Sequence, residues 1–312
     1  MTKNDYVFRY RVRNWRDYNR ALVARGRLTF WFDEAAIAGW RNTELRSGPG
    51  TPRIYSDTAI QCALVLKSVF HLSLRATQGF LGSVVELMKL ELPVPDYSTV
   101  SRRQSSLAVS LPTRKRVRHV VIDATGLKVY GAGEWHVQKH RSGRRRAWRK
   151  LHLGVDEATK EIVAVKVTTS SVHDSLMLPK LLGQIPGRVH QVSGDGAYDT
   201  RACYEAAHGR GAQVGIPPRR NAKPWEQNAD ASARVRNKNL RLVRMYGRYE
   251  WRVLSGCTRQ SLAENAFSRF KALFGGRLAA RGPDNQCVEV MVKCAALNRM
   301  TGIKMPDSVR VR

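Results

Sequence analysis

The chain has 312 residues, with 54 Lys or Arg against 25 Asp or Glu, so its formal net charge at pH 7 is +29. This charge attracts polyanions, so a nucleic acid is the expected partner. The alternative is that the basic charge only keeps the protein soluble. No apolar run reaches the roughly 18 residues of a membrane span, which excludes a membrane partner. Residues 1–5 lack a signal-peptide core and the five cysteines form no C-x-x-C pair, so we expect a cytoplasmic, nucleoid-associated protein.

Residues 1–110 are expected to form an all-α, helix-turn-helix-like DNA-binding region. Ser56 and Ser73 are suitable N-caps for two amphipathic helices, and a short polar helix begins at Ser98. Two helices followed by a short basic helix resemble a helix-turn-helix DNA reader, although an ordinary helical bundle is the alternative. The expected DNA contacts on the short helix are Arg102 and Arg103.

Residues 111–305 are predicted to form one α/β domain, with a mixed sheet flanked by helices. A buried strand ends near Asp123, and alternating runs over 148–155 and 162–168 predict a β-hairpin. A later strand ends at Asp195. Strands and helices that alternate along the chain in this way are typical of an α/β fold.

Several other features of this region have structural explanations. Asp156 lies in the predicted hairpin turn, while Asp174 and Asp199 are the predicted N-caps of the helices that follow. Residues from about 219 to 256 are basic and poor in periodicity. We therefore expect a basic insertion, or an extended DNA-contacting segment, before the last acidic helix.

Asp123, Asp195 and Glu264 are the candidate catalytic residues and metal ligands. The first two end buried strands, and Glu264 lies beside the apolar stripe of a helix over about 261–274. Phosphodiester cleavage needs a deprotonated nucleophile and a stabilised leaving oxygen, which two Mg²⁺ ions about 4 Å apart supply. Mg²⁺ prefers hard oxygen ligands and keeps several waters, so a few rigid carboxylates suffice. We expect that Mn²⁺ can substitute.

Each of these acids also has a structural explanation. Glu264 and Ser261 match a capping box, in which the glutamate satisfies the first turn of the helix. Asp123 can be a turn residue at a strand end, and Asp195 can form an Asx-turn between two glycines. The metal-site hypothesis therefore depends on the three acids together, in a strongly basic chain.

The densest basic tract lies over 139–150, between the first strand and the hairpin. A solvated loop is one explanation of such a tract. We favour phosphate binding, because the tract lies close to the predicted metal site. Its candidate DNA contacts are Lys139, Arg141, Arg144, Arg145, Arg146, Arg149 and Lys150.

Ordered motifs along most of the chain are more specific than any single pattern. In the N-terminal part they are Asn14-Trp15-x-x-Tyr18-Asn19-x-Ala21-Leu22, Tyr55-Ser56-Asp57, Leu74-Arg75-Ala76-Thr77-Gln78-Gly79 and Leu92-Pro93-Val94-Pro95-Asp96-Tyr97-Ser98-Thr99. In the catalytic part they are Asp123-Ala124-Thr125-Gly126-Leu127-Lys128, Trp148-Arg149-Lys150-Leu151-His152, Gly194-Asp195-Gly196-Ala197-Tyr198-Asp199 and Glu264-x₆-Lys271. In these motifs the chain resembles the bacterial insertion-sequence transposases of the IS5 family.

The resemblance implies a DDE transposase with an RNase H-like α/β fold and a triad of Asp123, Asp195 and Glu264. It also implies Mg²⁺ as cofactor, and double-stranded DNA at transposon ends and target as partner. The implied reaction is cleavage at terminal inverted repeats, followed by transfer of the 3′-OH into target DNA. A homodimer on DNA is expected, because two ends must be held together.

The Y-x₂-R-x₃-E-x₆-K signature related to this family is only partly kept. Glu264 and Lys271 fit it, whereas Cys257 and Gln260 occupy the tyrosine and arginine positions, and Arg259 lies one residue away. Lys271 and Arg259 are expected to contact DNA phosphates. The departures leave open a catalytically weakened, transposase-derived DNA-binding repressor or inhibitor. A host RNase H-like nuclease acting on branched DNA is a third hypothesis.

Overall fold

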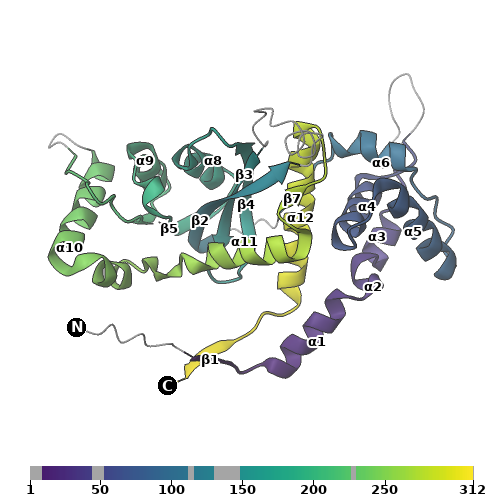
Figure 1. Cartoon of the computed structure of the whole chain (residues 1–312), viewed down its shortest axis with the longest axis horizontal. Helices are drawn as coiled ribbons and strands as arrows, with labels where there is room; N and C mark the ends of the chain where they lie inside the picture. Colours follow the sequence, from purple (N-terminus) through teal and green to yellow (C-terminus); the bar gives the residue numbers. More distant parts are fainter. Residues whose placement is uncertain (1–8, 44–52, 112–115, 130–147, 226–229, 312) are drawn as a thin grey trace, which may run out of the picture.

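A helical N-terminal part lies beside a mixed α/β part in the computed structural model (Figure 1), which describes residues 9–43, 53–111, 116–129, 148–225 and 230–311. Within these ranges, no single helix is long and apolar enough to cross a membrane; α4 and α5 meet that test only as a pair bent by 109°. The N-terminal helices are α1 (Trp15–Arg25), α2 (Leu28–Trp31), α3 (Glu34–Ala38), α4 (Asp57–Val69), α5 (Leu74–Leu87) and α6 (Tyr97–Gln104).

Side-chain caps determine where the N-terminal helices begin. The hydroxyl of Ser56 accepts the Ala59 N–H at the start of α4, and that of Ser73 accepts the Ala76 N–H at the start of α5. Both predicted caps are therefore confirmed. α6 begins at Tyr97, one residue before the expected Ser98, because Asp96 is the N-cap and its carboxylate accepts the Ser98 N–H.

The central sheet is mixed, as predicted. Its strand order is β4-β3-β2-β5-β6, and β7 pairs with the end of β2. β2 pairs antiparallel with β3, and β3 with β4, whereas β2, β5 and β6 run parallel and so does β7. The strands are β2 (Arg116–Val129), β3 (Trp148–Asp156), β4 (Ile162–Thr169), β5 (Arg188–Ser193), β6 (Gln213–Gly215) and β7 (Arg277–Leu278).

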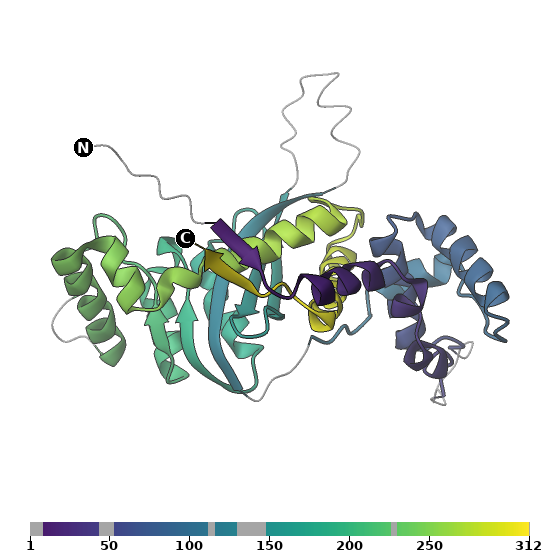
Figure 2. The same cartoon turned by 90° about the horizontal axis from the view of Figure 1, so that it is seen from below.

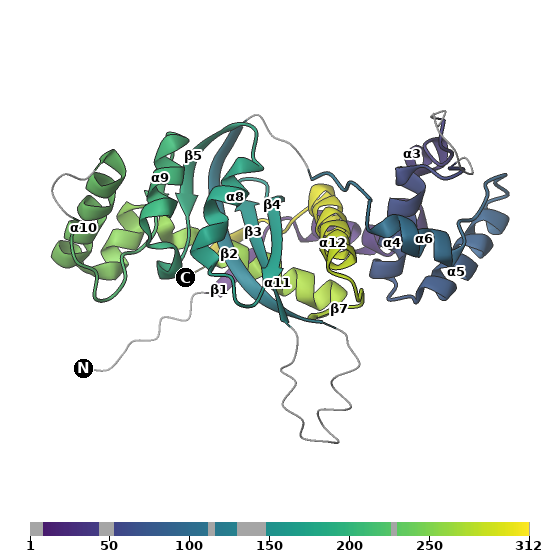
Figure 3. The same ribbon diagram turned by 90° about the horizontal axis from the view of Figure 1, so that it is seen from above.

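Helices cover both faces of this sheet (Figures 1 and 3). One hydrophobic cluster joins the sheet to α8 (Leu178–Gly183) and α9 (Arg201–Gly209). A second cluster joins it to α11 (Ser261–Phe274) and α12 (Pro283–Ile303). The residues of α11 that pack inward are Ala263, Ala266, Phe267, Phe270 and Phe274, which matches the predicted apolar stripe.

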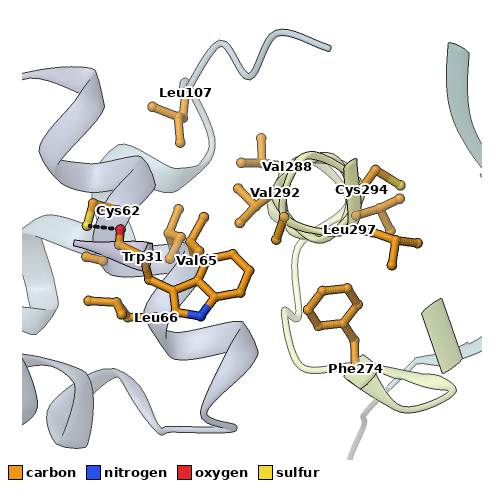
Figure 4. Close-up of a cluster of buried hydrophobic side chains, with 14 of the residues drawn as sticks. Trp31, Cys62, Val65, Leu66, Leu107, Phe274, Val288, Val292, Cys294 and Leu297 are labelled. Carbon is orange, nitrogen blue, oxygen red and sulfur yellow. Dashed lines mark hydrogen bonds between the residues drawn. The ribbon is translucent and has the colours of Figure 1, made fainter. Parts of the chain in front are cut away.

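The N-terminal helices share the second cluster with α12, as Figure 4 shows. In that view Val288 and Val292 of α12 lie opposite side chains from α2 and α4. Two polar contacts cross the same boundary: Gln104 donates to the carbonyl of Asn285, and Arg299 forms an ion pair with Asp33. The apolar core is thus continuous from the N-terminal helices to the sheet.

A small two-stranded sheet joins the two ends of the described chain (Figure 2). In it β1 (Arg9–Val12) pairs antiparallel with β8 (Ser308–Val311). The side chain of Asn14 extends the contact, since it donates to the Met305 carbonyl and accepts the Asp307 N–H. The beginning of α1 is therefore tied to the segment that follows α12.

The segment expected as a basic insertion contains a long helix between β6 and α11. This helix, α10 (Ala231–Leu254), is kinked at Gly247, whose φ is +82°. Its Arg236 is buried against Asp199, with Nε 3.1 Å from Oδ1 and Nη2 3.2 Å from Oδ2. Asp199 therefore does not cap α9 as expected: Thr200 occupies that position, and the carboxylate is used in a buried ion pair.

The Asp199–Arg236 pair generates a stability prediction. Asp199→Ala leaves the buried guanidinium without a counter-ion and should lower the free energy of unfolding by about 3–5 kcal/mol. The double variant Asp199→Leu/Arg236→Met should recover most of this loss, since it leaves no buried charge. Urea denaturation measures both, and wild-type stability in Asp199→Ala would contradict the assignment.

Candidate active site

Parallel strand pairing brings two of the three candidate acids to the same level of the sheet. Val121 of β2 is in register with Ser193, the last residue of β5, so Asp123 and Asp195 each lie two residues further along. β2 continues to Val129, so Asp123 lies within the strand rather than at its end as expected. The reason is that β3 pairs with β2 as far as Lys128.

The third acid comes from α11, which packs on β2 and β3. Glu264 is exposed, beside the buried face of this helix. The capping-box explanation of Glu264 is wrong: the N-cap position is Gln260, in a helical conformation and without a side-chain cap. The helix instead follows directly from the 3₁₀ turn η3 (Cys257–Arg259). The carboxylate of Glu264 is therefore not used as a cap in its own first turn.

The pKa of Asp123 is affected by its burial and by the carboxylates around it. Burial, together with the carboxylates of Asp195, Glu264 and Asp174, raises the pKa of Asp123 to about 6, while the hydrogen bond from the Ala124 N–H opposes the shift. That N–H lies 2.8 Å from Oδ1 of Asp123. The three candidate acids are thus electrostatic neighbours, and Asp174 is a fourth acid in the same field.

The donor set of this site fits a magnesium ion. Asp123, Asp195 and Glu264 offer only hard carboxylate oxygens, and a divalent cation would relieve the repulsion that adds to the effect of burial on the pKa of Asp123. Among the residues that the structure describes, no three acidic, His or Cys side chains already converge closely enough to hold one ion. Asp195 also accepts the Ala197 N–H at 2.9 Å, so the predicted Asx-turn is present at this residue.

Asp174 was expected to cap a helix, and it does not. It begins the 3₁₀ turn η1 (Asp174–Met177) without a capping bond, and its Oδ1 instead accepts from Lys150 Nζ at 3.0 Å. Lys150 also donates to the Val172 carbonyl at 2.8 Å. The reason is the course of β3, which brings Lys150 beside η1. Lys150, a predicted DNA contact, is therefore held next to an acid of the site.

Two buried polar groups near the acids were missed by the sequence analysis. Nδ1 of His152 and the hydroxyl of Tyr198 have no hydrogen-bond partner within the described ranges. Burial lowers the pKa of His152 to about 4, so its imidazole is neutral at neutral pH. Burial and the carboxylates of Asp123 and Asp174 raise the pKa of Tyr198, so its hydroxyl stays protonated. Both residues lie in motifs that the sequence analysis quoted for the catalytic part, and this was the sequence signal that could have identified them.

The basic residues that were predicted to contact phosphates near the acids differ in their exposure and in their hydrogen-bond partners. Lys271 is exposed and its Nζ donates to Thr125 Oγ1 at 2.6 Å, two residues beyond Asp123 on β2. Arg149 is half-buried and donates to Gln286 of α12 at 2.7 Å. The remaining candidates of the basic tract lie outside the described residues: Lys139, Arg141, Arg144, Arg145 and Arg146.

The two arginines of α6 differ in their surroundings. Arg102 is exposed on the helix surface. The side chain of Arg103 is only 13% exposed and forms an ion pair with Asp57, at the start of α4. Arg103 also donates to the Tyr55 carbonyl. It therefore holds α6 against α4, and Arg102 is the residue of the pair that faces solvent.

Gln260 and Arg259, at and beside the arginine position of the signature, make different contacts. Arg259 forms an ion pair with Glu157, whose N–H bonds to His119, four residues before Asp123 on β2. Gln260 Nε2 donates to the Ile122 carbonyl at 3.3 Å, directly before Asp123, and its Oε1 is buried without a partner in the described part. The glutamine is thus closer to the candidate acids than the arginine.

The raised pKa of Asp123 predicts how the stability of the metal-free protein varies with pH. Between the ordinary pKa of 3.8 and about 6, the folded protein holds a proton that the unfolded chain has lost, so stability falls as the pH rises through this window. Asp123→Asn should therefore raise Tm at pH 8 by about 2–4 °C, equivalent to roughly 1 kcal/mol at a half-buried site. The gain should vanish near pH 4.

Differential scanning fluorimetry in a chelator checks this, with the exposed Glu205→Gln of α9 as the matched control. The control should have the wild-type Tm at both pH values. A variant Asp123→Asn that is no more stable than wild type at pH 8 would show that burial and the neighbouring carboxylates do not disfavour the charged form of Asp123.

Known proteins similar to this chain are transposases. The sequence model of a family described as "Transposase DDE domain" matches residues 115–299, and a second family model with the same description matches residues 23–132. A cryo-EM structure of the piggyBac transposase synaptic complex with hairpin DNA is 11% identical, with a TM-score of 0.40, over 89% of this chain and 73% of that chain.

The crystal structure of the Mos1 strand transfer complex is 12% identical, with a TM-score of 0.23, over 72% of this chain and 80% of that chain. At these TM-scores neither solved structure bears on the site. The first family model, in contrast, spans more than half of the chain, including β2, β5 and α11 with all three candidate acids. The chain therefore belongs to the transposase DDE domain family and is a DNA transposase.

Proposed function

We propose that this transposase belongs to a bacterial insertion sequence of the IS5 family. It binds terminal inverted repeats, cleaves the DNA strand and transfers the 3′-OH into target DNA by Mg²⁺-dependent phosphoryl transfer. The observation that supports this most is the electrostatic coupling of Asp123 to Asp195 and Glu264, since three carboxylates from separate elements share one field. The mixed sheet with helices on both faces is consistent with an RNase H-like catalytic domain.

In this proposal Asp123, Asp195 and Glu264 hold two Mg²⁺ ions, for which Mn²⁺ can substitute. The bound metal supplies an activated water and neutralises charge on the leaving oxygen. Lys271, held near Asp123 by Thr125, binds a phosphate next to the scissile bond. The freed 3′-OH then attacks a phosphate of the target DNA in the same active site.

DNA binding in this proposal uses both parts of the chain. The boundaries that we propose are 1–110 for the helix-turn-helix-like region and 111–305 for the catalytic domain, with the basic insertion at about 219–256. Arg102 is the solvent-facing arginine of the α6 pair, and the net charge of +29 favours binding to double-stranded DNA. We further propose a homodimer on DNA, because two transposon ends must be held together.

A DNA-binding repressor or inhibitor with weakened catalysis is the second candidate. The observation that favours it is the pairing of Arg259 with Glu157, which holds the nearest arginine of the signature away from the acids. Gln260 brings only a neutral amide to that position. Specific binding to an end sequence, without Mg²⁺-dependent nicking, would identify this second candidate.

The proposed chemistry predicts a clear difference between acids. Asp195→Asn and Glu264→Gln should each lower Mg²⁺-dependent nicking of a labelled end duplex at least about a hundredfold, since each removes a ligand worth several kcal/mol. Glu205→Gln, an exposed acid on α9, should nick at the wild-type rate. Gel-shift titration should give unchanged DNA affinity for all three. Wild-type nicking by Asp195→Asn would contradict the proposal.

A further inference from the structure

A wide groove lies at the start of the parallel strands, away from the three acids. Its volume is about 1110 Å³, and its lining comes from β2, β5, β6, the β3–β4 turn and η3. Arg116 begins β2 and lies seven residues before Asp123, which corresponds to about 23 Å along an extended strand. The Arg and Lys residues that line the groove are Arg116, Arg118, Lys160, Arg188 and Arg259, and two histidines, His119 and His190, lie among them.

The carboxylate in the groove is already paired with basic side chains. Glu157 is the carboxylate found among the described lining residues. Its Oε1 lies 2.7 Å from Arg259 Nε, and its Oε2 lies 2.7 Å from His119 Nδ1. Burial lowers the pKa of His119, while Glu157 opposes that shift. The charge of Glu157 is thus used by Arg259 and does not offset the other arginines.

Three arginines of the groove have no acidic partner within the described ranges. Arg116, Arg118 and Arg188 are exposed, and none of them forms an ion pair there. Arg116 and Arg188 are direct neighbours in the register of β2 and β5. Like charges on neighbouring strand positions are unfavourable. A bound polyanion would convert this repulsion into attraction.

We propose that this groove binds the phosphate backbone of a second stretch of double-stranded DNA, separate from the stretch held at the three acids. The groove is too large for one phosphate ion, and its spread-out cations suit a row of phosphates rather than a single anion. Contacts to the phosphate backbone carry no sequence information, so we expect this binding to be independent of sequence. The inference rests on DNA as the substrate, and not on the assignment of the three acids.

Salt-dependent binding of the full-length protein to a labelled duplex tests this. Each phosphate contact contributes about 0.9 to the slope of log K against log salt concentration. Arg116→Gln/Arg188→Gln should therefore lower the slope by about 2, with or without a transposon end in the duplex. The matched control, Lys166→Gln/Lys180→Gln, removes two exposed lysines that do not line the groove and should keep the wild-type slope.

Neutralising Arg116 and Arg188 removes a repulsion, so Tm of the variant should not fall. Arg118→Gln provides a second, single-site test and should lower the slope by about 1. Carrying the measurement out in chelator, and again in an Asp195→Asn background, separates this inference from the proposed catalysis. The inference would be overturned if the arginine variants kept the wild-type salt slope. It would also be overturned if the lysine control lost as much of the slope as Arg116→Gln/Arg188→Gln.

Discussion

The burial of Asp123 beside other carboxylates is the unfavourable interaction that the rest of this structure must offset. Asp123 is half-buried in β2, and its pKa of about 6 reflects burial together with the charges of Asp195, Glu264 and Asp174. Packing elsewhere supplies the free energy that keeps these groups together. The inward face of α11, with Phe267 and Phe270, is buried in the larger hydrophobic cluster and so fixes the position of Glu264.

The same sheet separates charges of opposite sign. Acids lie where β2 passes the end of β5, and arginines lie where the two strands begin. Because Arg116 pairs with Arg188 and Val121 pairs with Ser193 in the same parallel ladder, one register fixes the positions of both sets. The continuous core between α12 and the N-terminal helices then fixes where Arg102 lies relative to the sheet. The fold thus determines the spacing of the surfaces that we propose to bind DNA.

Local signals in the sequence were sufficient for much of this architecture. The hydroxyls of Ser56 and Ser73 cap helices as predicted, because a cap bonds to an N–H only three residues away. The hairpin of β3 and β4 and the apolar face of α11 also follow from short-range periodicity.

Residues whose partners lie far along the chain could not be predicted in this way. Asp199 and Asp174 have the local context of caps, but their partners are Arg236 and Lys150, which only the tertiary structure brings to them. The helix α10 escaped notice because much of what it buries is polar, including Arg236. Tyr198 follows Asp195 closely in the sequence, so local structure brings it near that acid, whereas only the tertiary structure brings it near Asp123 and Asp174.

Binding of Mn²⁺, followed by electron paramagnetic resonance without DNA, tests most directly whether the three carboxylates form one metal site. Wild-type protein should bind Mn²⁺ at neutral pH, and both Asp195→Asn and Glu264→Gln should weaken that binding at least about tenfold. Glu205→Gln, which leaves the site intact, should match the wild type. Equal Mn²⁺ affinity in all four proteins would show that these acids do not act together on a metal ion.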